Sequence, residues 1–367
     1  MKRKIRRIAV NTGGGDAPGL NAVVRAVVLS ACRRGWEVLG IRKGYLGLLD
    51  TSQILQLTAE SVRGITHTGG SILGTVNKGN PFDFPFKLPD GTVTGVDRST
   101  EIVANYANLG IDALIAIGGD GSMRIANRLA EMGMSIVGVP KTIDNDLEGT
   151  VVTFGFDTAV SVATDALDRL HSTAESHERV FVVEVMGRYA GWIALHAGVA
   201  GGADVILLPE IPYDIEPVCR KIMDREAQGR HFSIVVVAEG AKPKGGEMVF
   251  KASGEVGKEA RLGGIAEVVA RQITEHTGKE TRTVVLGHLQ RGGRPTPRDR
   301  MLALQFGSAA VRMVAQGKFS TMVALDPPDV RAVPLSSTSR RMKTVPMDDH
   351  CLLAARDMGL SLGDEEE

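Results

Sequence analysis

The residues with the clearest potential for chemistry follow a short apolar run, in VGVPKTIDND at residues 137–146. Asp144 and Asp146 stand two positions apart, so they cannot both cap a helix. Phosphoryl transfer to an alcohol needs a carboxylate that accepts the hydroxyl proton and a metal ion that gathers phosphate charge. Asp144 fits the base, and Asp146 fits a structural contact or a contact to a substrate hydroxyl. The alternative is a solvated acidic turn.

A glycine cluster, TGGGDAPGLN at residues 12–21, lies between an apolar run and a helix-like segment. This order brings backbone amides and a helix N-terminus to a phosphate group. A dinucleotide fingerprint that starts at Gly13 would need glycine at position 18, which is Pro18, and the chain has no GxxxxGK[ST] sequence. The cluster therefore predicts a phosphate site of another type, with a tight strand-to-helix turn as the alternative.

A second glycine loop, IGGDGS at residues 117–122, also follows an apolar run. Asp120, which stands between glycines, could hold Mg²⁺ directly or through water. Gly121 and Ser122 could donate hydrogen bonds to phosphate oxygens. The alternative is that Asp120 caps the helix that follows. Two glycine loops on one sheet edge favour a nucleotide site.

Basic side chains stand at or beside the ends of several predicted strands. They are Arg179, Arg188, Arg282 and Arg291. Arginine is the usual partner of a doubly charged phosphate, because its planar fork binds two oxygens at once. Any one of the four could be a surface residue, but together they favour an anion site. His288 beside Gln290 fits either a substrate contact or a core histidine, and Glu239 fits either a contact to a sugar hydroxyl or a carboxylate that caps a strand end.

The elements that must position these residues are short apolar runs, each followed by glycine and then a helix-like segment. Most runs lack polar alternation, as expected for strands buried on both faces. The expected strands are 5–11, 36–42, 112–118, 135–140, 179–185, 204–209, 232–240 and 281–287, and the expected helices include 19–34, 121–132, 158–175, 189–200 and 257–275. This pattern predicts an α/β fold with mainly parallel sheets in two lobes, in which ligands bind at the carboxyl ends of the strands. The Pro- and Gly-rich stretch 77–97 predicts a loop or hairpin insertion.

The bulk composition is that of an ordinary globular protein. The 367 residues suit two domains better than one, and the formal net charge of zero argues against nucleic acid or an anionic membrane as a partner held by bulk electrostatics. No apolar run approaches the roughly 20 residues that cross a bilayer. Three widely separated cysteines fit a reducing compartment, so we expect a cytoplasmic protein. Together these observations predict a small-molecule kinase, with polyphosphate and metal on one side of a cleft and a phosphorylated polyol on the other.

The motifs also occur together in a known family. GGDAPGLN, GGDGS, PKTIDND, VVEVMGRYAGW, LPE, EGA and VLGHLQRGG follow in this order between residue 8 and about residue 300. In this combination they closely resemble the 6-phosphofructokinase family, although GGDG alone is similar to NAD kinases and lipid kinases. The resemblance implies two similar lobes with the active site in the cleft between them. We expect residues 1–155 with about 292–340 to form the donor lobe, 156–291 the fructose 6-phosphate lobe, and 341–367 a C-terminal extension.

The resemblance also implies an activity and a set of site residues. A phosphoryl group passes from ATP to the 1-hydroxyl of fructose 6-phosphate in glycolysis, with Mg²⁺ at Asp120, Asp144 as general base and Arg188 as a second catalytic residue. Donor-site positions are Gly15, Lys78, Gly79, Gly119, Asp120, Gly121 and Ser122. Positions around fructose 6-phosphate are Thr142, Ile143, Asp144, Asp146, Met186, Gly187, Arg188, Glu239, His288, Leu289, Gln290 and Arg291. Arg179 and Arg282 resemble arginines that reach the sugar phosphate in a neighbouring subunit, so we expect a homo-oligomer, a tetramer rather than a dimer.

Two positions bear on the phosphoryl donor. In this family, members that use ATP commonly have glycine where Lys141 stands, and members that use diphosphate commonly have lysine there with aspartate in place of Gly121. The chain combines Gly121 with Lys141, as in the mixed-substrate subgroup that is similar to the diphosphate enzymes. An aspartate at position 121 would add bulk and negative charge where the α-phosphate of ATP passes, so Gly121 favours ATP. The alternatives are a diphosphate-dependent enzyme and, more remotely, a non-catalytic sugar-phosphate sensor.

Overall fold

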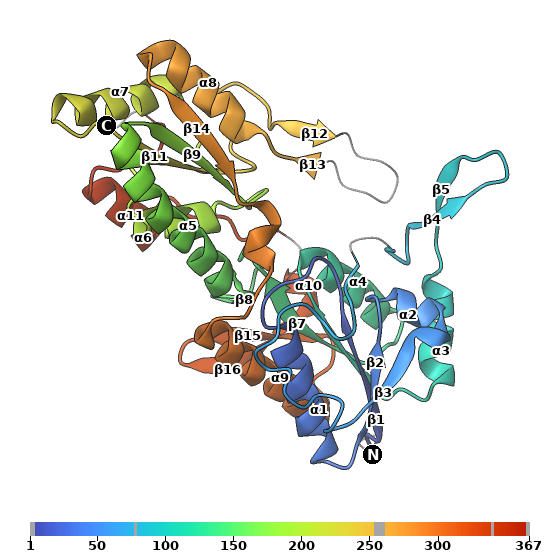
Figure 1. Cartoon of the computed structure of the whole chain (residues 1–367). Coiled ribbons are helices and arrows are strands. Elements are labelled where there is room, and N and C mark those ends of the chain that lie inside the picture. The colour runs from blue at the N-terminus through green and yellow to red at the C-terminus, as the bar shows by residue number, and fades with distance from the viewer. Residues whose placement is uncertain (1–3, 77–78, 253–260, 339–340, 365–367) are drawn as a thin grey trace.

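The computed structural model describes residues 4–76, 79–252, 261–338 and 341–364. It has two α/β lobes, each built on its own sheet (Figure 1). The predicted α/β fold with mainly parallel sheets is therefore confirmed. In the part of the chain described, no helix is long and apolar enough to cross a membrane.

The sheet of the first lobe follows the path β16-β15-β7-β6-β1-β2-β3, and β8 pairs with the end of β7. Its inner pairs are parallel, whereas the edge strands β3 and β16 are antiparallel to their neighbours. The strands are β1 (Arg7–Thr12), β2 (Glu37–Ile41), β3 (Ile54–Leu57), β6 (Ala113–Gly118), β7 (Ile136–Thr142), β8 (Phe154–Gly155), β15 (Thr321–Asp326) and β16 (Asp329–Pro334). Because the parallel strands end together, the polar loops after β1, β6 and β7 meet at one edge.

Helices cover both faces of this sheet, which explains the unbroken apolar runs. The helices are α1 (Leu20–Cys32) and α9 (Pro297–Gln316) on one face, and α2 (Leu46–Leu49), α3 (Ser99–Asn108) and α4 (Asp120–Glu131) on the other. Neighbouring residues of one strand belong to different layers: Ile115 is in the same hydrophobic cluster as Val23 and Phe306, whereas Leu114 is in the cluster of Ile102 and Leu129. This is the period of two that a pleated strand imposes.

The sheet of the second lobe follows the order β10-β11-β9-β14, with every pair parallel. Its strands are β9 (Val180–Val185), β10 (Val205–Leu207), β11 (Ser233–Ala238) and β14 (Thr281–Val285). The helices α5 (Phe156–His177) and α6 (Trp192–Ala200) cover one face, and α7 (Ile215–Ala227) and α8 (Ile265–Thr277) cover the other (Figure 1).

One strand departs from the sequence prediction. The run 281–287 was expected to be buried on both faces, but β14 is an edge strand on which Arg282, Thr283 and Val285 are exposed. An apolar edge strand of this kind is a ready surface for another chain. The insertion predicted at 77–97 does contain a hairpin, formed by β4 (Phe84–Lys87) and β5 (Val93–Val96). The remaining short elements are η1 (Thr51–Gln53), β12 (Phe250–Ala252), β13 (Arg261–Leu262), η2 (Gly287–Arg291), α10 (Leu335–Thr338) and α11 (His350–Asp357).

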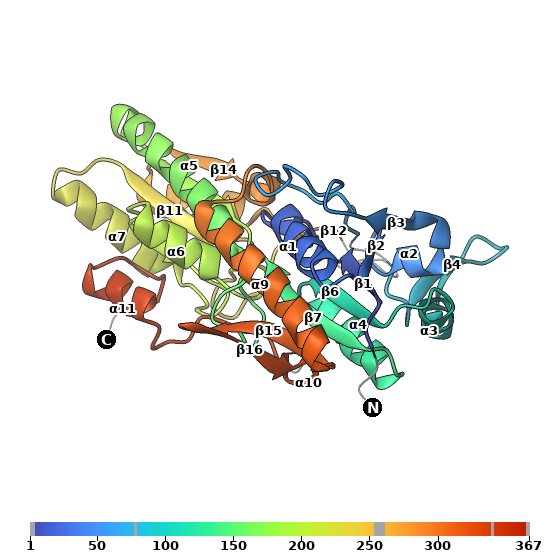
Figure 2. The same cartoon turned by 90° about the horizontal axis from the view of Figure 1, so that it is seen from below.

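The C-terminal segment, residues 341–364, returns to the second lobe. There α11 packs beside α6 (Figures 1 and 2), and Leu352 joins the hydrophobic core. The Val345 N–H donates to Glu210 Oε1 at 2.8 Å, and the Ser361 N–H donates to the carbonyl of Asp204 at 3.1 Å. The lobe boundaries expected near residues 155, 292 and 341 stay a prediction.

Two adjacent leucines of α11 test whether this segment contributes to stability. Leu352 is 1% exposed and Leu353 is 41% exposed. We expect Leu352→Ala to lower the free energy of unfolding by about 2–4 kcal/mol, because it leaves a cavity in the core. Leu353→Ala should change it by less than about 0.5 kcal/mol. Denaturant unfolding measures both, and equal effects would show that α11 is not part of the core.

Candidate functional site

Two glycine loops pack against each other at the carboxyl edge of the first sheet. They follow β1 and β6, whose ends are paired at Thr12 and Ile117. The Gly13 N–H donates to the carbonyl of Ile117 at 2.8 Å, and a Cβ on Gly13 would lie 2.6 Å from Ser122 Oγ. Gly14 has a φ of 74°, which favours glycine. The glycines are therefore needed for the close approach of the two loops.

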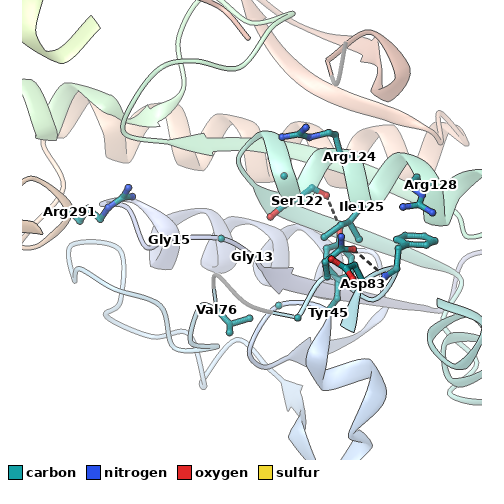
Figure 3. Close-up of a pocket in the computed structure, with 16 residues that line it drawn as sticks. Gly13, Gly15, Tyr45, Val76, Asp83, Ser122, Arg124, Ile125, Arg128 and Arg291 are labelled. Carbon is teal, nitrogen blue, oxygen red and sulfur yellow. Dashed lines mark hydrogen bonds between the residues drawn. The ribbon is translucent and has the colours of Figure 1, made fainter. Parts of the chain in front are cut away.

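A cavity of about 840 Å³ opens beside these loops (Figure 3). Arg291 lies at one end of it, and Arg128 and Asp83 lie at the other (Figure 3). Its lining comprises Gly13, Gly14, Gly15, Gly44, Tyr45, Val76, Gly79, Asn80, Phe82, Asp83, Gly121, Ser122, Arg124, Ile125, Arg128 and Arg291. Four predicted donor-site residues are among them, namely Gly15, Gly79, Gly121 and Ser122. Lys78 lies outside the described residues. A cavity lined by backbone amides and arginines suits a polyphosphate.

Asp120 is the first residue of α4 and does not cap it. The N-cap is Gly119, and the Asp120 carboxylate instead forms an ion pair with Arg124. The alternative interpretation of Asp120 as an N-cap is therefore wrong. Among the described residues, no group of three or more His, Cys, Asp or Glu side chains could hold a metal ion. A single carboxylate beside a phosphate pocket still fits Mg²⁺, which usually binds one or two carboxylates together with substrate phosphates and water.

Asp144 and Asp146 form a half-buried carboxylate pair just beyond β7. One carboxylate oxygen of each is buried and has no hydrogen-bond partner among the described residues. Burial, together with the like charges of Asp146 and Glu239, raises the pKa of Asp144 to about 7 against the opposing charges of Arg291 and Lys141. Burial likewise raises the pKa of Asp146. The carboxylates are therefore partly shielded from solvent rather than fully solvated, and the unpartnered oxygens are free to accept bonds from a ligand.

The turn that carries these carboxylates is fixed from both sides. The Asp144 N–H donates to Thr142 Oγ1 at 3.1 Å. Asn145 is 4% exposed and takes a left-handed conformation with a φ of 52°. Its Oδ1 accepts the Thr153 N–H at 3.1 Å. Asparagine tolerates this conformation better than most residues, so the sequence Asp-Asn-Asp directs two carboxylates out of one tight turn.

Lys141 is 3% exposed and ties the end of β7 to the first glycine loop, because its Nζ donates to the carbonyl of Gly15. Burial first, and then the nearby charge of Arg291, lowers the pKa of Lys141 to about 8. The carboxylates of Asp144, Asp16 and Asp146 oppose this shift. The ammonium of Lys141 therefore lies between the predicted donor site and the carboxylate pair.

The second lobe presents its predicted site residues at the carboxyl ends of β9 and β11. Met186, Gly187 and Arg188 follow β9, and Glu239 follows β11. The Gly240 N–H donates to the carbonyl of Gly187 at 3.0 Å, which joins the two strand ends. Burial, and then repulsion from Glu184, raises the pKa of Glu239, whereas Arg291 and Arg188 lower it. Glu239 therefore shares the charged environment of Asp144.

Arg291 brings η2 of the second lobe to the first lobe, since its Nη1 donates to the carbonyl of Asp16 at 3.1 Å. Gln290 is fully buried; its Oε1 accepts the Met186 N–H at 3.3 Å, and its Nε2 donates to the carbonyl of Gly287 at 3.0 Å. Gln290 thus braces the strand end rather than facing open space. His288 and Leu289 are exposed, so the core interpretation of His288 is wrong.

Three predicted residues do not join this cluster with their side chains. The Ile143 side chain is fully buried in the core, so its main chain alone could meet a ligand. Arg179 and Arg282 lie at the amino-terminal ends of β9 and β14, the opposite end from Met186. The six residues of β9 span about 20 Å. Both arginines form ion pairs with Glu280.

Sequence reasoning missed several residues of this region. Arg124 and Arg128 lie on α4, and Arg128 stands 3.5 Å from the centre of the Phe82 ring. Their spacing of four on one helix face beside a glycine loop could have revealed them. Lys343, from the C-terminal segment, donates to Asn145 Oδ1 at 2.9 Å. No local pattern marks Lys343, because nearly 200 residues separate the two partners.

Fold and site together define a two-lobed α/β protein with an anion-binding cavity beside buried carboxylates. The sequence profile described as Phosphofructokinase matches residues 7–314, and the chain belongs to the phosphofructokinase family. It is 53% identical to a protein of Chloroflexus aurantiacus named ATP-dependent 6-phosphofructokinase, with 100% of both chains covered. It is 49% identical to ATP-dependent 6-phosphofructokinase 1 of Synechocystis, with 99% of both covered. The crystal structure of Pichia pastoris phosphofructokinase in the T-state superposes with a TM-score of 0.79 at 32% identity, covering 92% of this chain and 36% of that longer chain.

The burial of Asp144 predicts a pH-dependent gain in stability on its removal. A raised pKa means that the folded protein favours the protonated acid, so the carboxyl destabilises the fold increasingly as pH rises from the ordinary aspartate pKa of 3.8 to about 7. We expect Asp144→Asn to add on the order of 2 kcal/mol more stability at pH 8 than at pH 5. Thermal unfolding at both pH values measures this. Asp165→Asn, at an exposed position of α5, is the control and should behave alike at both; a pH-independent effect at Asp144 would contradict its raised pKa.

Proposed function

We propose that this protein is an ATP-dependent 6-phosphofructokinase, which transfers the γ-phosphoryl group of ATP to the 1-hydroxyl of fructose 6-phosphate and releases fructose 1,6-bisphosphate and ADP. Similarity over the full chain to relatives with this name supports the proposal. The observation that carries it is the position of Asp144, a half-buried carboxylate whose nearby charges include Arg291, which lines the cavity, and Glu239, which follows β11 in the second lobe.

Asp144 acts as the general base in this proposal. The 1-hydroxyl of the sugar gives its proton to the Asp144 carboxylate while its oxygen forms the new bond to phosphorus and the bond to the ADP oxygen breaks. A pKa of about 7 suits this task, because about half of the carboxylate is then ionised at neutral pH and it is still basic enough to accept the proton. Arg291 supplies positive charge near Asp144 and Glu239, and Arg188 supplies positive charge near Glu239.

Asp120 is the residue that would hold Mg²⁺ together with phosphate oxygens. When bound there, the ion neutralises phosphate charge. The N-terminus of α4 and the backbone of Gly119, Gly121 and Ser122 add hydrogen-bond donors that need no ion. Gly15 and Gly79 leave the backbone open to the donor from the other side of the cavity.

The acceptor sugar is held by residues from both lobes. Thr142, Asp146 and Glu239 offer oxygen atoms to its hydroxyl groups, and Met186, Gly187 and Arg188 form the opposite wall. His288, Leu289 and Arg291 extend the wall along η2. Most of these side chains are partly buried, and hydrogen bonds of a buried carboxylate to hydroxyl groups are specific as well as strong.

The distance of Arg179 and Arg282 from this cluster supports a shared site in a homo-oligomer. Arg282 lies on the edge strand β14 and Arg179 lies just before the neighbouring strand β9, and both form ion pairs with Glu280, which directly precedes β14. In a tetramer or dimer that covers this edge, the two arginines would reach the sugar phosphate bound to a neighbouring chain. A tetramer is the favoured assembly.

Replacement of the base tests the mechanism. We expect Asp144→Ser to lower kcat by about 10²–10⁴-fold, since it removes the proton acceptor. The dissociation constant of fructose 6-phosphate, measured by calorimetry without donor, should change little. Near-normal turnover by this variant would mean that another group is the base.

The donor is tested by substitution of Gly121. A Cβ at this position meets no atom within 4 Å, so a longer side chain extends into the cavity. In a coupled assay supplied with either ATP or diphosphate, we expect the wild type to use ATP. Gly121→Asp should lower kcat/KM for ATP by about 100-fold or more, through like-charge repulsion of phosphate. The kcat/KM of Gly121→Ala for ATP should remain close to that of the wild type. Gly121→Asn has the size of aspartate without its charge, so its kcat/KM separates the effect of bulk from the effect of charge. Turnover of diphosphate without turnover of ATP would establish the alternative enzyme.

Complementation tests the shared site. Arg282→Ala and Asp144→Ser chains should each be nearly inactive as pure assemblies. If a site takes Arg282 from one chain and Asp144 from another, mixtures of the two variants that are refolded together should recover about a quarter of wild-type activity. With equal amounts and random assembly, about a quarter of the sites combine an intact Asp144 from one variant with an intact Arg282 from the other. A mixture that stays as inactive as its components would show that each chain completes its own site.

A further inference from the structure

Lys343 lies beneath the carboxylate turn, although it belongs to the C-terminal segment and lies beyond the residues that the family profile matches. Its Nζ donates to Asn145 Oδ1 at 2.9 Å, to the carbonyl of Thr150 at 3.1 Å and to the carbonyl of Val151 at 2.8 Å. All three protons of the ammonium therefore have acceptors in one loop of the first lobe. The backbone N–H of Lys343 donates to the carbonyl of Asp146 at 2.9 Å.

These bonds act on the residue that shapes the turn. Asn145 separates the two carboxylates and is held in a left-handed conformation. Its Oδ1 accepts one bond from Thr153 and one from Lys343, so both lone pairs are used. A rotation of the Asn145 side chain would break both bonds at once. Lys343 therefore helps to fix the directions in which Asp144 and Asp146 leave the chain.

The same lysine is anchored to the second lobe. Its carbonyl accepts the indole Nε1–H of Trp192 at 3.1 Å, and its Nζ stands 5.5 Å from the centre of the Trp192 ring. Two residues further on, the Val345 N–H donates to Glu210, which also accepts the Gly191 N–H at 3.0 Å. The segment thus joins the turn of the first lobe to the start of α6 in the second.

We propose that Lys343 is a positioning residue of the phosphoryl-transfer site, which orients the Asp144–Asp146 pair through Asn145 and holds a positive charge behind it. The proposal rests on the proposed function for its catalytic consequence. Lys343 does not touch the sugar or the donor; it acts through the turn.

Charge supports the same role. Asp146 and Glu148 favour the charged form of Lys343, while burial lowers its pKa to about 8. Lys343 in turn lowers the pKa of Asp146. The other charged groups that face the carboxylate pair are Lys141 from β7, Glu239 from the end of β11 and Arg291 from η2. Removal of Lys343 leaves one cation fewer against the same carboxylates, so protonation of the coupled pair should occur at a higher pH.

The experiment compares Lys343→Met with Lys221→Met in the full-length protein. Lys221 is also partly buried and also binds the C-terminal segment, since its Nζ donates to the carbonyl of Gly359 at 2.6 Å, but it lies away from the turn. Lys343→Met should lower kcat by about tenfold or more, the loss expected for a hydrogen bond from a charged group. The acid limb of its pH–kcat profile should move to higher pH. Lys221→Met should change thermal stability while leaving kcat and the acid limb within about twofold of the wild type.

A second variant keeps the test valid if Lys343→Met does not fold. Lys343→Gln can still donate to Asn145 but carries no charge, so it should recover part of kcat and retain the shifted acid limb. An unshifted limb in the folded variants, or equal losses of kcat at positions 343 and 221, would overturn the proposal.

A further measurement separates this proposal from the assigned activity. The carboxyl ¹³C resonances of Asp144 and Asp146, assigned from the Asp144→Asn and Asp146→Asn spectra, report titration without turnover. They should titrate at higher pH in Lys343→Gln than in the wild type. If the wild-type protein is inactive but the carboxyl titration still moves to higher pH in Lys343→Gln, only the proposed reaction is refuted. If the wild-type protein is active and the titration does not move in Lys343→Gln, only the role of Lys343 is refuted.

Discussion

The site depends on holding two half-buried carboxylates side by side in one turn. Asp144 and Asp146 repel each other, and burial disfavours the charge of both. Lys141, Arg291 and Lys343 offset part of this cost, and each comes from a different part of the chain. The first glycine loop binds Lys141, η2 supplies Arg291, and the C-terminal segment supplies Lys343. Burial and the charge repulsion that remains raise the pKa of Asp144, which is the property that the proposed proton acceptor needs.

Much of the fold follows from local patterns in the sequence. Unbroken apolar runs predict β1, β6, β7, β9 and β11, because strands with helices on both faces need no polar alternation. The glycine loops after β1 and β6 predict a phosphate site, because glycine lets the backbone approach a phosphate closely. In the structure the absence of side chains also lets the two loops approach each other closely. The exposed position of β14 could not be predicted this way. Its sequence pattern is the same whether helices of the same chain or the surface of another chain would cover its apolar residues.

Candidate site residues could be proposed from the sequence where one short segment carries all of the information. Asp144 and Asp146 stand out in a single turn and Asp120 in a single loop, and their roles stay predictions. Gln290 and Lys343 could not, because the role of each depends on partners about 100 and 200 positions away. In the sequence alone, a polar side chain that hydrogen-bonds to the backbone cannot be told from one that contacts a ligand. The two can be distinguished only when its hydrogen-bond partners are known.

The path of the chain between the two sheets limits how the lobes move. The chain leaves the first sheet after β8, returns through η2 to α9, and leaves again between α10 and Lys343. Two crossings would form a hinge about which one lobe could swing widely. A third connection, bonded at Asn145 on one side and at Trp192 on the other, ties the lobes together at a further point. A wide swing of one lobe against the other would have to break these bonds.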